Sequence, residues 1–174
     1  MRPFIFTLSA IVMLQIIFLS SNSTAIADAL KLQITSPAIS EGGAIPTPFT
    51  CSGENKIPPL AWTGVPSDAK SLVLLVEDPD APSGTFVHWV VYDISPSSNG
   101  IKANVDAKEG LNSTGKAAYM GPCPPPGSPH HYHFTLYALD TNLNLDGAPN
   151  ARALHAAMQG HVIESADLVG IFGR

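Results

Sequence analysis

The sequence contains few of the features that mark several common classes of protein. Lysine and arginine total nine against fourteen acidic residues, and no run of like charge occurs along the chain. Binding to nucleic acid requires a basic surface that offsets the phosphates, so no nucleic-acid partner is expected. No Gly-x-Ser-x-Gly pattern is present, which argues against a serine hydrolase built on a nucleophile elbow. Arginine is rare, with only Arg2, Arg152 and Arg174 in the chain, so we do not expect an anion site built from several arginines.

A long hydrophobic run occurs only at the start of the chain. Arg2 precedes an apolar segment from Phe4 to Leu19, and Ala25-Ile26-Ala27 has the small-x-small pattern of a cleavage site. We expect a secretory signal peptide over residues 1–27, a single mature domain over residues 28–174, and a periplasmic or secreted location. An uncleaved membrane anchor is the alternative, but the run is shorter than the roughly 20 residues that a membrane span needs.

Cysteine is scarce, and both cysteines follow the expected cleavage site. Cys51 and Cys123 allow one intramolecular disulfide, which an oxidising compartment favours. Such a bridge ties an early loop to a proline-rich loop. Two buried thiols or a pair of metal ligands remain the alternatives.

Short apolar segments separated by loops rich in proline and glycine predict a mainly β protein. The expected strands cover residues 32–34, 57–63, 71–76, 86–94, 131–139 and 167–172. One helix is expected over Ala151–Gln159, with Asn150 as its cap and Gly160 at its end. We therefore expect antiparallel β-sheet in a Greek-key or sandwich arrangement, with the helix packed outside.

Alternation of side chains along the expected strands predicts which residues share a face. In the segment 86–94, period-two alternation places His88 with Val90, Tyr92 and Ile94. In the segment 131–139, Tyr132 begins a face that continues through Phe134, Leu136 and Ala138. His130 extends this second face if the strand begins one residue early.

Two stretches concentrate the groups capable of chemistry. The first is Asp78-Pro79-Asp80-Ala81-Pro82, followed by His88, and the second runs from Gly121 to Gly127, followed by His130 and Tyr132. An aspartate of the first stretch can orient the His88 ring and favour its charged form. Backbone amides of Gly121 and Cys123 can point at an anion, whereas the prolines have none. The two stretches predict a pocket for a phosphate or a carboxylate.

Other interpretations of the same residues stay open. The aspartates can form turns, His88 can be a core residue, and the Tyr132 ring can simply pack. A metal site of His130, His131, His133 and Cys123 conflicts with alternation, which sends His131 and His133 to the face opposite His130. Acid–base catalysis by Asp78 and His88 is also compatible with the sequence.

Several further motifs lie in order along the expected domain. They are Cys51-Ser52-Gly53-Glu54-Asn55, Pro58-Pro59-Leu60-Ala61-Trp62, Gly64-Val65-Pro66 and Tyr137-Ala138-Leu139. Together with the two stretches above, they resemble the phosphatidylethanolamine-binding protein family, in its bacterial branch of Raf kinase inhibitor-like proteins. The resemblance covers nearly the whole of residues 28–174.

The resemblance implies a large antiparallel sheet, a smaller second sheet and a shallow pocket for phosphate, a carboxylate such as acetate, or a phospholipid head group. Its implied ligand-binding residues are Asp78, Asp80, Pro82, Phe86, His88, Gly121, Cys123, Pro124, His130 and Tyr132. No catalytic residue, metal or cofactor is expected. Inhibition of a protein partner, a protease or kinase, through the same pocket is an alternative, as is a weak phosphoester hydrolase. A homodimer is compatible with the sequence.

Overall fold

The structure is a computed structural model that describes residues 31–101 and 106–174. The expected signal peptide and its cleavage site therefore lie outside the described residues. Within the described part of the chain, no helix is both long enough and apolar enough to span a membrane.

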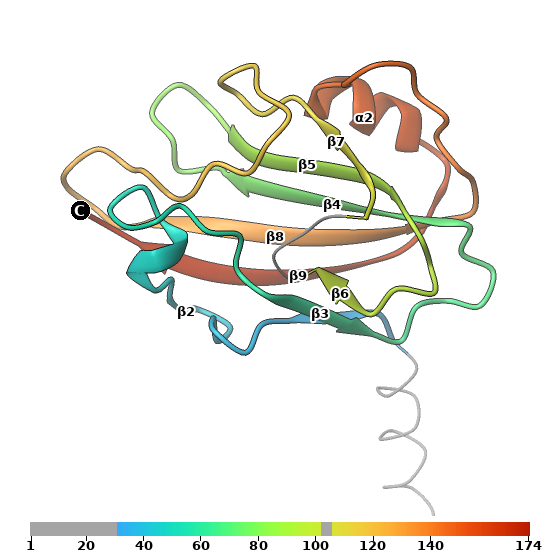
Figure 1. Cartoon of the computed structure of the whole chain (residues 1–174), viewed down its shortest axis with the longest axis horizontal. Helices are drawn as coiled ribbons and strands as arrows, with labels where there is room; N and C mark the ends of the chain where they lie inside the picture. The colour runs from blue at the N-terminus through green and yellow to red at the C-terminus, as the bar shows by residue number, and fades with distance from the viewer. Residues whose placement is uncertain (1–30, 102–105) are drawn as a thin grey trace, which may run out of the picture. The chain divides into compact units, whose positions relative to one another are not determined.

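A six-stranded sheet forms the centre of the fold (Figure 1). Its strands, in spatial order, are β2 (Gly43–Ala44), β9 (Val162–Phe172), β8 (His130–Leu139), β4 (Ser71–Asp78), β5 (Phe86–Ile94) and β7 (Lys108–Gly110). All neighbours are antiparallel except β2 and β9. Because β8 returns beside β4 after β5 and β7, the order β8-β4-β5-β7 is a Greek key, as predicted.

A three-stranded sheet and one described α-helix complete the architecture. The small sheet has the order β1 (Gln33–Thr35), β3 (Leu60–Thr63) and β6 (Gly100–Ile101), and a 3-10 turn, η1, covers Thr47–Phe49. The main core lies between the two sheets and includes Trp62, Trp89 and Phe134. The other face of the large sheet packs Val73 and Leu75 against α2 (Ala151–Met158). Mainly β structure with an external helix is confirmed.

The predicted elements differ from the observed ones mainly at their ends. β5 has the predicted bounds, β4 continues past the predicted end to Asp78, and β9 begins at Val162 rather than Asp167. The first half of β9 is largely exposed, so it lacks the apolar alternation that marks a strand. Asn150 caps α2 by accepting from the Ala153 amide at 3.0 Å. The elements β2, η1, β6 and β7 were not predicted. Each has only two or three residues, which is too few to show a periodic pattern of apolar side chains.

The strand β5 does not keep the predicted alternation. Val76 pairs with Trp89 but Glu77 pairs with Val87, so His88 is an extra residue in a β-bulge. A bulge re-aims the side chains beside it. Trp89 lies in the core between the sheets, and the His88 ring contacts Tyr132 of that same core. Val87 and Val90 pack on the opposite side, with α2.

The predicted grouping of His88 with Val90, Tyr92 and Ile94 is therefore wrong at both ends. A second irregularity at Asp93, whose φ is 53°, returns Ile94 to the core between the sheets. The bulge at His88 brings its imidazole to the same side of the large sheet as His130 and Tyr132. This is the local feature that allows one site to form.

Candidate functional site

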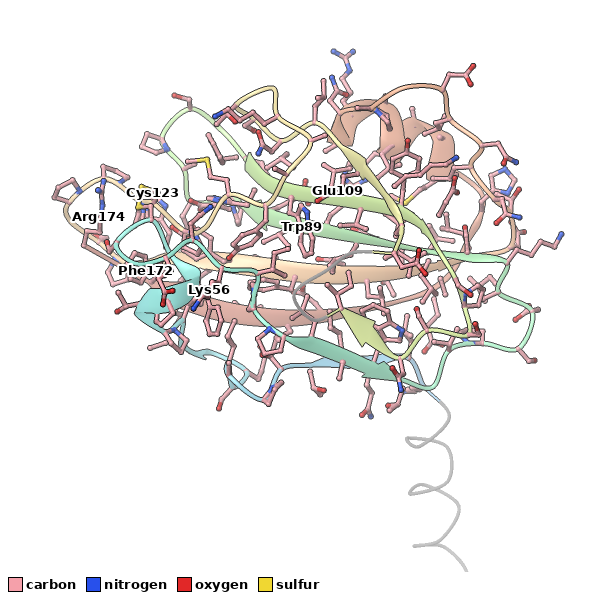
Figure 2. All side chains as sticks on the ribbon, viewed as in Figure 1. Lys56, Trp89, Glu109, Cys123, Phe172 and Arg174 are labelled. Carbon is pink, nitrogen blue, oxygen red and sulfur yellow. A yellow bond between two sulfur atoms is a disulfide. The ribbon has the colours of Figure 1, made fainter. Side chains whose placement is uncertain are left out.

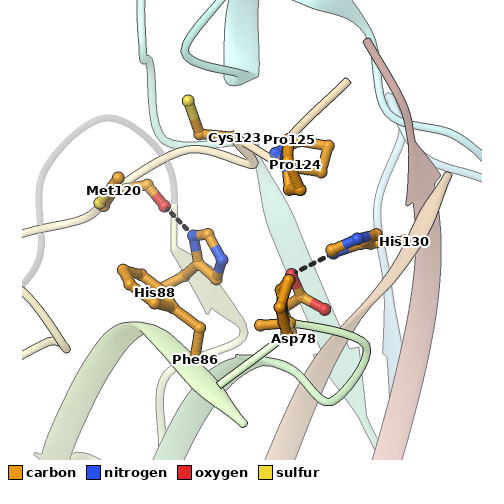
Figure 3. A pocket seen from close by; sticks show the side chains of 10 residues that line it. Asp78, Phe86, His88, Met120, Cys123, Pro124, Pro125 and His130 are labelled. Carbon is orange, nitrogen blue, oxygen red and sulfur yellow. Dashed lines mark hydrogen bonds and ion pairs between the residues drawn. The ribbon is translucent and has the colours of Figure 1, made fainter. Parts of the chain in front are cut away.

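A cavity of about 200 Å³ lies where β4 and β5 meet the start of β8 (Figure 3). Its lining combines two imidazoles and one carboxylate with apolar side chains. The lining residues are Asp78, Ala81, Pro82, Phe86, His88, Met120, Cys123, Pro124, Pro125 and His130. Figure 3 shows Asp78, His88 and His130 facing the same space, beneath Cys123, Pro124 and Pro125.

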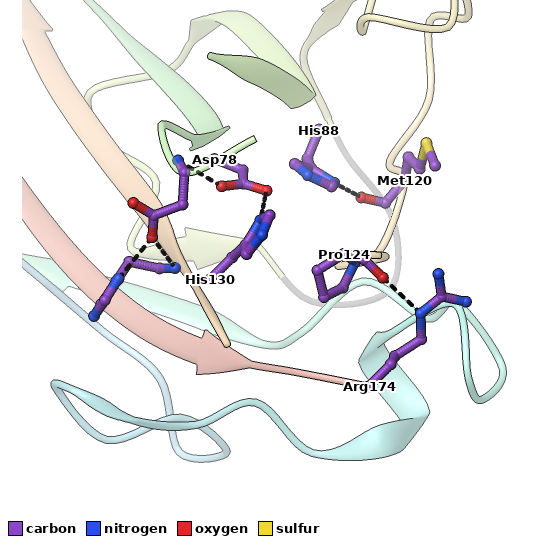
Figure 4. A network of polar contacts seen from close by, with 8 residues as sticks. Asp78, His88, Met120, Pro124, His130 and Arg174 are labelled. Carbon is purple, nitrogen blue, oxygen red and sulfur yellow. Dashed lines mark hydrogen bonds and ion pairs between the residues drawn. The ribbon is translucent and has the colours of Figure 1, made fainter. Parts of the chain in front are cut away.

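Asp78 and His130 form a buried pair at one side of the cavity (Figure 4). His130 Nδ1 lies 2.7 Å from Asp78 Oδ2, and both residues are less than 8 % exposed. The other carboxylate oxygen, Oδ1, accepts from the Asp80 amide at 2.9 Å. Each oxygen of this buried carboxylate thus has a hydrogen-bond partner, as burial of a charge requires. The bond also orients His130, whose Nε2 is the ring nitrogen not used in it.

His88 is held by the main chain rather than by a carboxylate. Its Nδ1 lies 2.7 Å from the carbonyl oxygen of Met120, which can only accept, so Nδ1 carries the proton. Burial lowers the pKa of His88, and the bond to Met120 and the charge of Asp78 offset this only in part. The expectation that an aspartate orients His88 is wrong, whereas Asp78 does favour the charged ring, though by less than burial disfavours it. The lowered pKa favours the neutral ring at pH 7, which leaves a lone pair on Nε2.

Tyr132 lies behind the cavity, between the two histidines. Its ring meets His88 edge-on at a centroid distance of 5.2 Å and stacks on His130 at 6.5 Å. The hydroxyl is fully buried and makes no hydrogen bond with any described residue. Burial, followed by the charges of Asp78 and Asp80, raises the pKa of Tyr132; the Cys123 backbone opposes this without reaching hydrogen-bond geometry. Tyr132 is therefore a neutral buried phenol with unused donor capacity.

Cys123, Pro124 and Pro125 form one side of the cavity, called here the proline-rich wall, and several contacts anchor it. The predicted disulfide between Cys51 and Cys123 is present and links segments 72 residues apart. The Cys51 amide donates to the Pro122 carbonyl at 3.1 Å. From the far side, Arg174 Nε donates to the Pro124 carbonyl at 2.6 Å. Figure 2 shows Cys123, Phe172 and Arg174 at the same end of the large sheet. The wall is consequently rigid without regular secondary structure.

Comparisons with known proteins agree with this fold. The family model of the phosphatidylethanolamine-binding protein matches residues 35–173. The chain belongs to this family. A UPF0098 protein of Methanothermobacter thermautotrophicus is 44 % identical over 151 residues, covering 82 % of this chain and 99 % of that protein. A UPF0098 protein of Pyrococcus horikoshii is 46 % identical over 140 residues, covering 75 % and 71 % of the two chains.

Two solved structures of the phosphatidylethanolamine-binding protein family are similar to the present one. A family homologue from Chlamydia trachomatis has a TM-score of 0.80 and 41 % identity, covering 83 % of this chain and 99 % of that one. YbcL of E. coli, described as a member of the mammalian family, has a TM-score of 0.76 and 30 % identity, with the same coverage. These relatives share the two-sheet architecture over nearly their whole length.

The cavity contains seven of the ten residues predicted from the family resemblance. These are Asp78, Pro82, Phe86, His88, Cys123, Pro124 and His130. Asp80, Gly121 and Tyr132 do not line it. Asp80 turns outward, where its Oδ2 lies 2.7 Å from His131 Nδ1. The Gly121 amide donates to Asn55 Oδ1 at 2.6 Å, so the expectation that it points at an anion is wrong.

Gly121 instead has a packing role. A Cβ at this position would lie 2.6 Å from the Phe49 carbonyl oxygen and 2.8 Å from Asn55 Oδ1, so only glycine fits against this loop. Ala81, Met120 and Pro125 line the cavity and were missed, as was the anchoring role of Arg174. Ala81 and Pro125 lie inside the two predicted stretches. Met120 and Arg174 carry no sequence signal. Met120 holds His88 through its own main-chain carbonyl, and the Arg174 side chain bonds the main-chain carbonyl of Pro124.

Proposed function

We propose that this chain is an exported, non-enzymatic binding protein for a small anion: phosphate, a carboxylate or the phosphate of a phospholipid head group. The observation that carries the proposal is one small cavity with two oriented imidazoles, His88 and His130. A volume of about 200 Å³ lies below the roughly 300–1,000 Å³ of typical drug-sized ligand pockets, which favours a compact ligand. The apolar lining from Pro82, Phe86 and Met120 suits an ester or short alkyl part beside the anionic group.

The chemistry of the His88 imidazole couples the binding of an anion to the uptake of a proton by the ring. In the free protein the neutral His88 offers an acceptor at Nε2. A bound negative charge raises the pKa of His88, so the ring takes up a proton and Nε2 becomes a donor. Asp78 holds Nδ1 of His130, so Nε2 is the ring nitrogen available to a bound ligand. The buried Tyr132 hydroxyl has unused donor capacity directly behind both rings.

Calorimetric titration with phosphate and with phosphoethanolamine tests the proposal. We expect saturable binding at one site and an affinity at least tenfold lower in His88→Gln. His161→Gln is the matched control, because His161 is exposed and pairs with Asp140 away from the cavity. Equal affinity in wild type and His88→Gln, or no binding of either ligand by the wild type, contradicts the proposal.

Phosphoester hydrolysis is the second candidate function. The observation that favours it is that His88 and His130 each have Nδ1 fixed by a hydrogen bond, which leaves both Nε2 atoms for a base and an acid. Turnover of a phosphomonoester that is abolished in Asp78→Asn and in His88→Gln would support this function. Product formation that is unchanged in both variants would identify a contaminating phosphatase instead.

Export is the remaining part of the proposal, and it rests on the sequence of residues 1–27. Expression of the full chain in a bacterial host, followed by fractionation and mass spectrometry, tests it. We expect periplasmic or secreted protein whose first residue is Asp28. An intact chain in the membrane fraction would instead identify an uncleaved anchor.

A further inference from the structure

Two histidines of β8 lie on the outer face of the large sheet, away from the cavity. His131 and His133, called here the outer histidine pair, are two residues apart on one strand and therefore share a face. Their side chains are 53 % and 36 % exposed, whereas that of His130 is 9 % exposed. The alternation that removes them from the anion cavity thus places them together in solvent.

Each member of the outer histidine pair is oriented by its own carboxylate. His131 Nδ1 lies 2.7 Å from Asp80 Oδ2, which also accepts the His131 amide at 2.9 Å. His133 Nδ1 lies 2.7 Å from Asp167 Oδ2, and Thr135 Oγ1 donates to the second oxygen of Asp167. Histidines that bind metal ions almost always donate their other ring N–H to a carboxylate, carbonyl or water, which fixes the tautomer with Nε2 as the ligand.

The surroundings of the outer histidine pair are acidic. Glu77 is the cross-strand partner of His133, and its carboxylate lies 3.7 Å from His155 Nε2. Residues directly opposite on neighbouring strands have Cβ atoms about 5 Å apart, so Glu77 adds a negative charge beside His133. With Asp80 and Asp167, three carboxylates surround the two imidazoles. The local charge therefore favours a cation and disfavours an anion.

We propose that the outer histidine pair binds a divalent transition-metal ion through the two Nε2 atoms, with Cu²⁺ bound most tightly. Imidazole ligands suit Cu²⁺, Ni²⁺ and Zn²⁺ rather than Mg²⁺ or Ca²⁺, and affinity among first-row ions peaks at Cu²⁺. Cα atoms two residues apart on a strand are separated by about 7 Å, a spacing that two side chains on one face can bridge to a single ion. Among residues 31–101 and 106–174, no three potential ligands are placed to hold an ion together, so the proposal assigns only the two imidazoles as protein ligands.

Titration of the untagged protein with CuCl₂ tests this proposal by calorimetry and electron paramagnetic resonance. We expect one site with two coordinated nitrogens in the wild type, and no comparable binding of MgCl₂. His131→Gln and His133→Gln should each weaken Cu²⁺ binding at least tenfold, and the double variant should be little worse than either single variant. That non-additivity distinguishes chelation by the pair from two independent imidazoles.

His161→Gln is the matched control. His161 is 47 % exposed and its Nδ1 lies 2.8 Å from Asp140, so it has the same local chemistry, but neither residue two positions away along the chain is a histidine. It should leave Cu²⁺ affinity unchanged. Paramagnetic broadening in a ¹H–¹⁵N spectrum should centre on β8 around residues 131–133. Equal losses in His131→Gln, His133→Gln and His161→Gln, or broadening centred on the anion cavity, would overturn the proposal.

Discussion

His88 and Met120 are joined by two hydrogen bonds in opposite directions. The His88 ring donates to the Met120 carbonyl at 2.7 Å, and the Met120 amide donates to the His88 carbonyl at 3.0 Å. The bulge in β5 directs the imidazole toward the cavity. The hydrogen bond from the ring to the Met120 carbonyl then fixes its tautomer. A main-chain carbonyl holds the ring without giving it a negative partner, and burial of the imidazole still lowers the pKa of His88.

The pH dependence of anion binding follows from the lowered pKa of His88. Because the free protein holds His88 neutral and a bound anion favours the charged ring, binding takes up a proton. Affinity should therefore rise as the pH falls from 8 to 6, by up to about tenfold per pH unit. Sulfate is a suitable probe, since it does not titrate in this range. Calorimetry in buffers of different ionisation enthalpy should give net proton uptake in wild type and none in His88→Gln. Proton uptake that is equal in the two proteins would contradict this role.

The buried hydroxyl of Tyr132 predicts opposite effects on stability and on binding. Removing a hydroxyl that has no partner should leave the free energy of unfolding unchanged or raise it by about 1 kcal/mol. Tyr132→Phe should nevertheless weaken phosphate binding about fivefold. Tyr119→Phe is the matched control: the Tyr119 hydroxyl donates to the Phe49 carbonyl at 2.8 Å, so its loss should cost about 1 kcal/mol and leave binding unchanged. Urea unfolding and calorimetry separate the two outcomes.

The disulfide should matter more for stability than for the shape of the cavity. A bridge over 72 residues stabilises by about 4 kcal/mol in the chain-entropy description. The double variant Cys51→Ser, Cys123→Ser should lose about this amount in urea unfolding, and the wild type should lose as much with a reductant. Phosphate affinity should change less than fivefold, because the Pro122, Gly121 and Pro124 contacts still hold the wall. Loss of all binding on reduction would show that the bridge alone maintains the cavity.

Arg174 should contribute to both the stability of the protein and its affinity for phosphate, because it holds Pro124 of the proline-rich wall. Replacing Arg174 with methionine keeps the aliphatic bulk but removes the bond to the Pro124 carbonyl, and with it the positive charge near Tyr132. We expect a decrease of a few degrees in the unfolding temperature and an affinity for phosphate at least threefold lower. Arg152→Met, on the exposed side of α2, is the control and should change neither quantity. Equal behaviour of the two variants would exclude a specific role for Arg174.

Much of the fold could be predicted because the relevant signals are local. The apolar run beginning at Ser71 and the alternation from Tyr132 identify strands directly. Asn150 and Gly160 mark the ends of a helix through capping and a left-handed residue. The predicted start of the strand 57–63 is wrong: β3 begins at Leu60, since Pro58 and Pro59 cannot donate to the ladder. Short strands such as β6 were missed because their conformation comes from their partners.

The sequence by itself determined most of the chemical groups of the site: the Asp78 carboxylate, the imidazoles of His88 and His130, and a proline-rich wall tied by Cys51 and Cys123. Only the tertiary structure decided how they pair. Asp78 bonds His130, Asp80 bonds His131, and His88 bonds Met120. The reason is that partner choice depends on the register between β4, β5 and β8 and on the bulge at His88. A shift of one residue along a strand reverses the face of every side chain, and no local pattern encodes that shift.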